Sequence, residues 1–204
     1  MGDNLKIIGV TGGIGAGKST VLAWLHERYR AKVLEADRIG HEVMEPGTAV
    51  YRRIVELYGT SILTEDQKID RGSLGAIVFS DQEKLKKLNG VIHPAVKEEI
   101  LRRIDKAREE KETYVVVEAA LFLEENYDAF CDETWYIYTN EETRAKRLKE
   151  SRGYTKERIA QIFANQKRHE EFLSRCEVVI DNNGTPDETR QQIDRRMKKA
   201  DEIM

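Results

Sequence analysis

Residues 12–19, with the sequence GGIGAGKS, decide the fold of this chain. They fit the pattern GxxxxGKS, a glycine-rich loop that follows a strand, opens a helix and binds phosphate. The run before the loop, Leu5–Val10 (LKIIGV), is short, apolar and rich in β-branched residues, which favours a buried strand. The segment after it, Ser19–Tyr29, has apolar residues at helical spacing. The order strand, loop, helix therefore predicts a phosphate-binding turn in an α/β fold.

The residue types in this phosphate loop (residues 12–19) suit a nucleoside triphosphate with Mg²⁺. Glycines allow backbone conformations that a Cβ forbids, so that N–H groups converge on phosphate oxygens at a helix N-terminus. Lys18 adds a positive charge at the β- and γ-phosphates, and the hydroxyl of Ser19 is a ligand for Mg²⁺. The expected nucleotide contacts in and beside the loop are Gly12, Gly13, Gly15, Ala16, Gly17, Lys18, Ser19 and Thr20.

The composition argues against a nucleic-acid-binding, membrane-spanning or disulfide-bonded protein. The 204 residues suffice for one core with helical insertions, and a formal net charge of −3 gives no general attraction to nucleic acid. The sequence has no apolar run of about 18 residues and no signal segment at residues 1–3, so we expect no membrane partner. Cys131 and Cys176 lie far apart without metal-ligand spacing, which favours two reduced thiols in a cytoplasmic protein. Oligomeric state stays open.

Strand and helix patterns alternate along the chain. Further apolar runs predict strands at 32–36, 113–119, 133–139 and 177–181, with helical stretches between them. This alternation predicts a five-stranded parallel sheet flanked by helices. The gap between the second and third strands is too long for one crossover helix and favours a helical substrate-binding insertion, while the charged segment 147–170 suits a lid. The expected parts are a nucleotide-binding core (1–36, 112–146 and 171–204), an insertion (37–111) and the lid (147–170).

Two helix starts are marked by capping boxes. Residues 139–142 (TNEE) and 185–188 (TPDE) each place a threonine three positions before a glutamate, and Pro186 falls at a first helical position.

Phosphoryl transfer fits these parts better than nucleotide switching. The guanine motif Asn-Lys-x-Asp is missing, and a short chain with an early phosphate loop, an insertion and an arginine-rich late segment is typical of a small-molecule kinase. Asp37 follows the second strand, whose carboxyl end lies at the ligand-binding edge of a parallel sheet. A carboxylate there can orient an acceptor hydroxyl and take its proton. Asp37 could instead be an N-cap of the following helix.

The chain resembles the dephospho-CoA kinase family, ATP-dependent enzymes with a P-loop kinase fold that phosphorylate the ribose 3′-hydroxyl of dephospho-CoA in the last step of coenzyme A biosynthesis. The resemblance runs from about Ile7 to Asn182. It is carried by GVTGGIGAGKST at 9–20, EADRIGH at 35–41, VF at 78–79, LNGVIHP at 88–94, LFLE at 121–124, Arg147, Arg152, Gln166 and IDN at 180–182.

The resemblance implies a role for each matching residue. Asp37 would be the catalytic carboxylate, with Lys18 and Arg147 neutralising charge on the transferring phosphoryl group. Arg152 and Asn182 would lie near the adenine of ATP. The residues implied on the dephospho-CoA side are Asp37, His41, Phe79, His93, Pro94, Leu123 and Glu124.

These side chains also have simpler interpretations. Pro94 suits the first turn of a helix over 95–110, with His93 just before it. Phe79 suits a core, as do Leu121 and Leu123. His41 could lie on a helix surface, and Asn182 could form a turn. Arg147, Arg152 and Glu124 could simply face solvent.

The sequence departs from the family pattern at four places. Glu35, Ala120 and Arg144 stand where aspartate, proline and glutamine are common, and Cys176-Glu177 stands where Ala-Asp is common. These departures put the fine geometry of the acceptor site in doubt. The rival functions are another P-loop kinase, such as a nucleoside monophosphate kinase, and a nucleotide-dependent switch that transfers nothing. Glu118, at the end of the third predicted strand, is a weaker candidate near Mg²⁺.

Overall fold

The computed structural model describes residues 5–201, with side chains up to residue 199. The chain forms two compact units: a sheet unit of residues 1–34 and 107–204, and a helical unit of residues 35–106. In the described part of the chain, no helix combines the length and apolar character that crossing a membrane requires.

The sheet unit is built on five parallel strands in the order β2-β3-β1-β4-β5. β1 is central, with Gly9 opposite Val117 of β3 on one side and Thr134 of β4 on the other. Strands that are buried on both faces read as continuous apolar runs, and each predicted strand agrees with the observed one to within one residue at either end. The strands are β1 (Lys6–Thr11), β2 (Lys32–Glu35), β3 (Tyr114–Glu118), β4 (Glu133–Tyr138) and β5 (Val178–Asp181).

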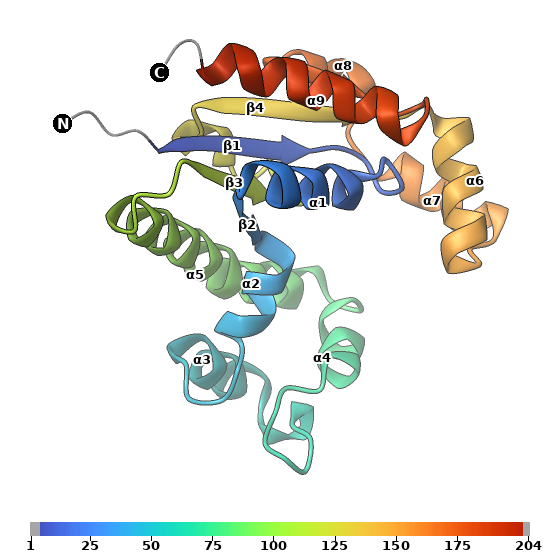
Figure 1. The fold of residues 1–204 in the computed structure, drawn as a ribbon. Coiled ribbons are helices and arrows are strands. Elements are labelled where there is room, and N and C mark those ends of the chain that lie inside the picture. Colours follow the sequence, from blue (N-terminus) through green and yellow to red (C-terminus); the bar gives the residue numbers. More distant parts are fainter. Residues whose placement is uncertain (1–4, 202–204) are drawn as a thin grey trace. The chain divides into compact units, whose positions relative to one another are not determined.

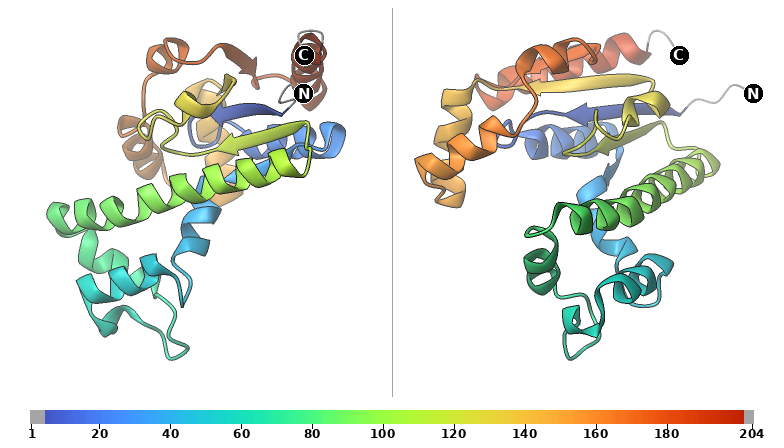
Figure 2. Two further views of the ribbon diagram at one scale, coloured as in Figure 1. Left: turned by 90° about the vertical axis from the view of Figure 1, so that its left-hand side faces the viewer. Right: turned by 180° about the vertical axis from the view of Figure 1, so that it is seen from behind.

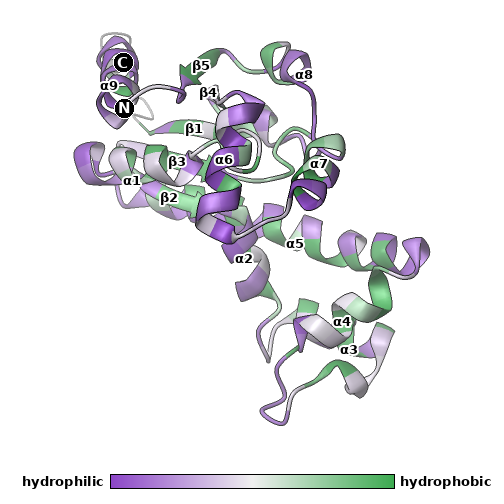
Figure 3. Cartoon of the chain, turned by 90° about the vertical axis from the view of Figure 1, so that its right-hand side faces the viewer, coloured by the Kyte–Doolittle hydropathy of each residue, from purple (hydrophilic) through white to green (hydrophobic). Residues whose placement is uncertain are grey.

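Helices α1 (Lys18–Tyr29) and α9 (Pro186–Asp201) pack together on one face of this sheet (Figure 1). Figure 3 shows that α9 is mostly hydrophilic; its Ile193 and Met197 are fully buried in the core that the two helices share with the strands. Asp194 of α9 accepts hydrogen bonds from the indole of Trp24 and the hydroxyl of Tyr29 at 2.9 and 2.7 Å, which joins the two helices.

Aromatic side chains cover other strand residues. Tyr136 of β4 stacks on Phe172 of the short helix α8 (His169–Leu173), with ring centroids 4.6 Å apart. Phe122 lies against Gly9 so closely that a Cβ at Gly9 would be 2.2 Å from its ring. Only glycine therefore fits at the centre of β1.

Helices α6 (Glu141–Arg152) and α7 (Lys156–Ala164) follow β4 and lie side by side (Figure 2). The expected capping box at 139–142 is wrong. Asn140 is the N-cap, accepting from the N–H of Thr143 at 2.8 Å, while Thr139 is buried under the phosphate loop. The box at 185–188 is confirmed, since Thr185 and Glu188 exchange backbone-to-side-chain hydrogen bonds at the start of α9.

The helical unit has its own core, formed by Ile54, Ile62, Leu74, Val78 and Leu88. Its longest helix, α5, runs without interruption through Pro94, so the expected helix start at Pro94 is wrong. The helices of this part of the chain are α2 (Ala36–Val43), α3 (Ala49–Tyr58), α4 (Arg71–Val78) and α5 (Gln82–Glu109), with a 3₁₀ turn at Thr60–Ile62.

Candidate phosphate-binding site

The phosphate loop leads from the end of β1 into α1. Gly12, Gly15 and Gly17 all have positive φ, at 149°, 79° and 87°, which favours glycine at each position. Gly17 is the N-cap of α1, so the helix begins at Lys18 with its first N–H groups next to the loop. A helix N-terminus with converging backbone donors attracts anions, because the unpaired N–H groups and the helix dipole act together.

Three polar side chains converge on one carbonyl of this loop. The oxygen of Ala16 accepts hydrogen bonds from Asn182 Nδ2 at 2.7 Å, Thr139 Oγ1 at 3.0 Å and Arg147 Nη1 at 3.4 Å. Arg147 also donates to the carbonyl of Asn182 at 2.9 Å. Thr139 after β4, Asn182 after β5 and Arg147 on α6 therefore fix the loop through the Ala16 carbonyl.

These contacts define what Asn182 and Arg147 do in this structure. Asn182 is buried, and its Oδ1 accepts from Thr189 Oγ1 at 2.9 Å, so both ends of its amide have partners within the protein. Its expected place near adenine stays a prediction. Arg147 is half-buried beside the loop, so the solvent-facing interpretation is wrong for it. Its expected role at the phosphoryl group stays a prediction. Arg152 is exposed at the end of α6, with its guanidinium 6.0 Å from the ring of Tyr154.

Lys18 folds back onto the phosphate loop. Its Nζ donates to the carbonyl of Gly12 at 2.8 Å and lies 3.5 Å from Oε1 of Glu118. Glu118 ends β3, directly opposite Val10 of β1, and is buried. The lysine is thus held at the loop by a carbonyl and a carboxylate, both weaker attractors than a polyphosphate.

The oxygen donors at this point fit Mg²⁺. The Ser19 side chain is exposed at the start of α1, and the Glu118 carboxylate lies beside Lys18. Mg²⁺ keeps several waters and takes one or two protein oxygens together with substrate phosphates, so these two groups suffice. Among the described residues, no group of three or more His, Cys, Asp or Glu side chains forms a metal site.

Arg144 is a loop contact that the sequence pattern did not assign. Its Nε donates to the carbonyl of Ile14 at 2.9 Å, and its Nη2 donates to Oε1 of Gln166. The guanidinium lies 4.3 Å from the ring centroid of Phe163 in α7. Burial lowers the pKa of Arg144 from its ordinary value, although an arginine stays charged. The only sequence signal is its departure from the family's glutamine.

Residues 121–124, which follow β3, only partly match the core placement expected for Leu121 and Leu123. Leu121 is 45% exposed, so its placement in the core is wrong, whereas Leu123 is buried, as the core interpretation expects. The carbonyl of Leu123 accepts from Arg175 at 2.8 Å, which leaves neither its side chain nor its carbonyl exposed to a substrate. Glu124 is exposed, and one of its oxygens lies 3.6 Å from Nζ of Lys167.

Asp37 and His41 both belong to α2 of the helical unit. Asp37 is exposed in the first turn, two positions after the last residue of β2. The N-cap interpretation is wrong, because the N-cap position is Glu35, whose side chain makes no capping hydrogen bond. His41 is exposed in the last turn of α2.

The remaining acceptor-side candidates lie on α4 and α5. Phe79 follows the last residue of α4 and is 81% exposed, so the core interpretation is wrong and its ring is open to a ligand. His93 is half-buried in the middle of α5. Pro94 is exposed beside a shallow cavity of about 510 Å³ that Lys97, Glu98 and Leu101 also line.

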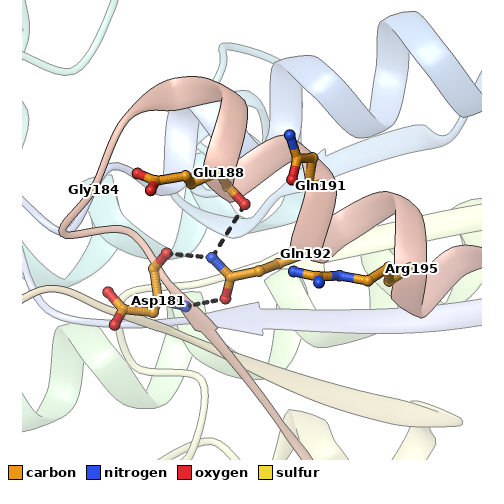
Figure 4. A pocket seen from close by; sticks show the side chains of 6 residues that line it. All are labelled: Asp181, Gly184, Glu188, Gln191, Gln192 and Arg195. Atoms are coloured by element: carbon orange, nitrogen blue, oxygen red, sulfur yellow. Dashed lines mark hydrogen bonds between the residues drawn. The ribbon is translucent and has the colours of Figure 1, made fainter.

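A polar cavity of about 360 Å³ lies at the outer edge of the sheet (Figure 4). The side-chain amide of Gln192 pairs with β5 as a neighbouring strand would, accepting from the N–H of Asp181 at 2.9 Å and donating to its carbonyl at 2.8 Å. This pairing satisfies the backbone N–H and carbonyl of Asp181 at the end of the edge strand and caps that end of the edge. We therefore interpret the cavity as part of the edge cap rather than of the phosphate site.

Comparison with known proteins identifies the family. A profile described as dephospho-CoA kinase matches residues 6–188. The chain is 39% identical to the dephospho-CoA kinase of Carboxydothermus hydrogenoformans, covering 93% of this chain and 91% of that protein, and 40% identical to that of Geobacter sulfurreducens, covering 93% and 96%. This chain belongs to the dephospho-CoA kinase family. The expected resemblance and the expectation of a phosphate-transferring kinase are thereby confirmed.

Solved structures agree with this assignment. The dephospho-CoA kinase of Campylobacter jejuni matches the family member described here with a TM-score of 0.66 and 25% identity, covering 96% of this chain and 97% of that one. A shikimate kinase of Acinetobacter baumannii has a TM-score of 0.55 at 16% identity, covering 97% and 96%, and shows the fold alone. The predicted P-loop kinase fold is confirmed.

Proposed function

We propose that this chain transfers the γ-phosphoryl group of ATP to the ribose 3′-hydroxyl of dephospho-CoA, giving coenzyme A and ADP in the last step of coenzyme A biosynthesis. The observation that carries the proposal is a phosphate loop with three positive-φ glycines at the start of α1, in a chain whose family match spans residues 6–188.

The sheet unit supplies the nucleotide side. Backbone N–H groups of the loop and of α1 bind the phosphates, and Lys18 exchanges the Gly12 carbonyl and Glu118 for β- and γ-phosphate oxygens. Ser19 and Glu118 would hold Mg²⁺, which when bound neutralises charge on the phosphates. Arg147 is held beside the loop by Ala16 and Asn182, from where it stabilises charge on the transferring group. Arg152 binds near adenine.

The helical unit supplies the acceptor side. The exposed groups His41, Phe79 and Pro94 contact dephospho-CoA, together with His93. The 3′-hydroxyl oxygen bonds to the γ-phosphorus while its proton passes to Asp37, and the bond from the γ-phosphorus to the bridging oxygen of ADP breaks. The assignment of residues 37–111 to dephospho-CoA binding and of 147–170 to a lid belongs to this proposal.

Replacement of Asp37 tests the proposal. Asp37→Asn keeps the shape of the side chain but removes the base, so kcat should fall by at least about a hundredfold while ATP affinity changes little. Product formation is followed by mass spectrometry, as one added phosphate on dephospho-CoA. The matched control is Asp66→Asn, an exposed carboxylate of the same unit, which should leave turnover unchanged. Near-normal turnover in Asp37→Asn would remove Asp37 from the mechanism, and a wild-type protein that leaves dephospho-CoA unphosphorylated would end the proposal.

We further propose that the protein acts in the cytoplasm. The supporting observation is that Cys131 and Cys176 are both free thiols. Burial, assisted by neighbouring carboxylates, raises the pKa of each thiol to about 12, so both stay protonated and slow to react at neutral pH.

A further inference from the structure

Arg144 connects the tip of the phosphate loop to the lid through three contacts. Nε donates to the Ile14 carbonyl at 2.9 Å, the guanidinium lies 4.3 Å from the ring centroid of Phe163, and Nη2 donates to Gln166. Ile14 belongs to the loop, whereas Phe163 and Gln166 belong to the segment 147–170. One side chain on α6 thus touches both parts.

The contact with the loop extends to Gly13. A Cβ at Gly13 would lie 2.5 Å from Cζ of Arg144, so the guanidinium lies directly against the Gly13 backbone. A planar group with several donors can contact a backbone, donate to a carbonyl and face an aromatic ring at once, and an ammonium group cannot. Gly13 therefore leaves the space that the arginine occupies.

We infer that Arg144 is a positioning residue that fixes the Gly13–Ile14 tip of the phosphate loop in its phosphate-binding shape and couples that shape to the position of the lid. A loop held in this shape before the nucleotide arrives loses less conformational freedom on binding, so Arg144 increases affinity for a nucleoside polyphosphate without touching it. The inference rests on the proposed function only in that the loop binds nucleotide.

Calorimetry on the full chain tests this inference, with a non-hydrolysable ATP analogue and Mg²⁺. Arg144→Met keeps much of the apolar stem but removes the guanidinium, so Kd should rise by about tenfold or more, with a binding stoichiometry near that of wild type. Arg144→Lys should recover little of the loss, because the charge returns without the planar fork. A purely structural role would instead lower the stoichiometry and leave Kd unchanged.

Arg158→Met is the matched control. Arg158 also stacks on an aromatic ring, that of Tyr154 at 4.1 Å, and is exposed on α7. Its replacement should leave Kd unchanged. A Kd within twofold of wild type in Arg144→Met, full recovery in Arg144→Lys, or an equal loss in Arg158→Met would each overturn the inference.

The coupling to the lid is tested by Phe163→Leu, which removes the stacking partner and leaves the Ile14 hydrogen bond. This change should raise Kd severalfold in the wild-type background and have no further effect in Arg144→Met. Independent, additive losses would overturn the coupling, and Phe163→Leu carries the test by itself if Arg144→Met does not fold. Because calorimetry needs no acceptor, a failure of transfer to dephospho-CoA is distinguished from a failure of this inference.

Discussion

The glycines of the phosphate loop are needed for two separate reasons, backbone conformation and space. Gly12, Gly15 and Gly17 supply positive φ, which side chains with a Cβ adopt at a cost. Gly13 and Gly17 also leave room for Arg144 and Asn182, which approach within 2.5 and 2.2 Å of the position that a Cβ would take. Both reasons apply at Gly17, as they do at Gly12, where a Cβ would lie 2.6 Å from the carbonyl oxygen of Ile137.

Gly17→Ala should destabilise the protein by more than the roughly 1–2 kcal/mol that left-handed backbone costs by itself, because it also displaces the buried amide of Asn182. Urea unfolding followed by circular dichroism measures this loss. Gly153→Ala is the matched control, since Gly153 has φ of 63° and nothing within 4 Å of a Cβ. Equal losses in the two variants would show that the contact with Asn182 is unimportant.

At the scale of elements, β1, β4 and α9 are joined by one buried carboxylate. Glu133, which opens β4, accepts from Lys6 of β1 at 3.1 Å, from Arg196 of α9 at 2.6 and 2.7 Å, and from the indole of Trp135. Burial raises the pKa of Glu133, but these hydrogen bonds outweigh burial and hold the pKa below its ordinary value. The folded state therefore favours the ionised form.

Glu133 should make the free energy of unfolding depend on pH in the acid range. Because its folded pKa lies below its unfolded value, its contribution is complete above the unfolded pKa, near 4.5, and is lost as the pH falls through the folded pKa. Glu133→Gln should cost about 3 kcal/mol at pH 7, since it leaves Arg196 and Lys6 without their partner, and less at acid pH. Denaturant titrations at several pH values measure the difference. A pH-independent difference, or an equal effect in the exposed Glu27→Gln, would contradict this prediction.

Helix α5 carries a proline where helices disfavour one. Pro94 lacks an N–H, so the carbonyl of Gly90 loses its usual partner within the helix. An alanine costs up to about 3 kcal/mol less than proline in a helix interior. A proline at an exposed position inside a helix carries this cost without a packing benefit, which fits the contact with dephospho-CoA that we propose.

Pro94→Ala should therefore raise the denaturation midpoint while weakening dephospho-CoA binding. The expected kinetic result is a higher KM for dephospho-CoA with an unchanged KM for ATP, which serves as the internal control. A variant that gains stability and keeps both KM values would show that Pro94 has no part in binding the acceptor.

At the scale of the whole molecule, the division into a sheet unit and a helical unit separates two kinds of predicted contact. The residues that we assign to nucleotide binding lie in the sheet unit, and most of those that we assign to dephospho-CoA lie between residues 35 and 106. Each unit has its own hydrophobic core, so ligand-induced protection can be measured separately in each unit.

Hydrogen exchange should resolve the two ligands along the chain. Dephospho-CoA should slow exchange within residues 37–111, whereas an ATP analogue with Mg²⁺ should slow it in the phosphate loop and within residues 139–182, because bound ligands suppress local opening. Protection by dephospho-CoA that is confined to the sheet unit would contradict the assignment of the acceptor to the helical unit.

The five strands, the phosphate loop and the family could all be predicted from the sequence, because apolar runs and the GxxxxGKS spacing are patterns among neighbouring residues. The tertiary structure alone decided which side chains hold the loop. Asn182 and Ala16 are 166 positions apart, and Arg144 and Ile14 are 130 apart, so no local pattern connects them. It also decided that α5 continues through Pro94, against the local preference to begin a helix there, because helix propensity is weak beside tertiary packing.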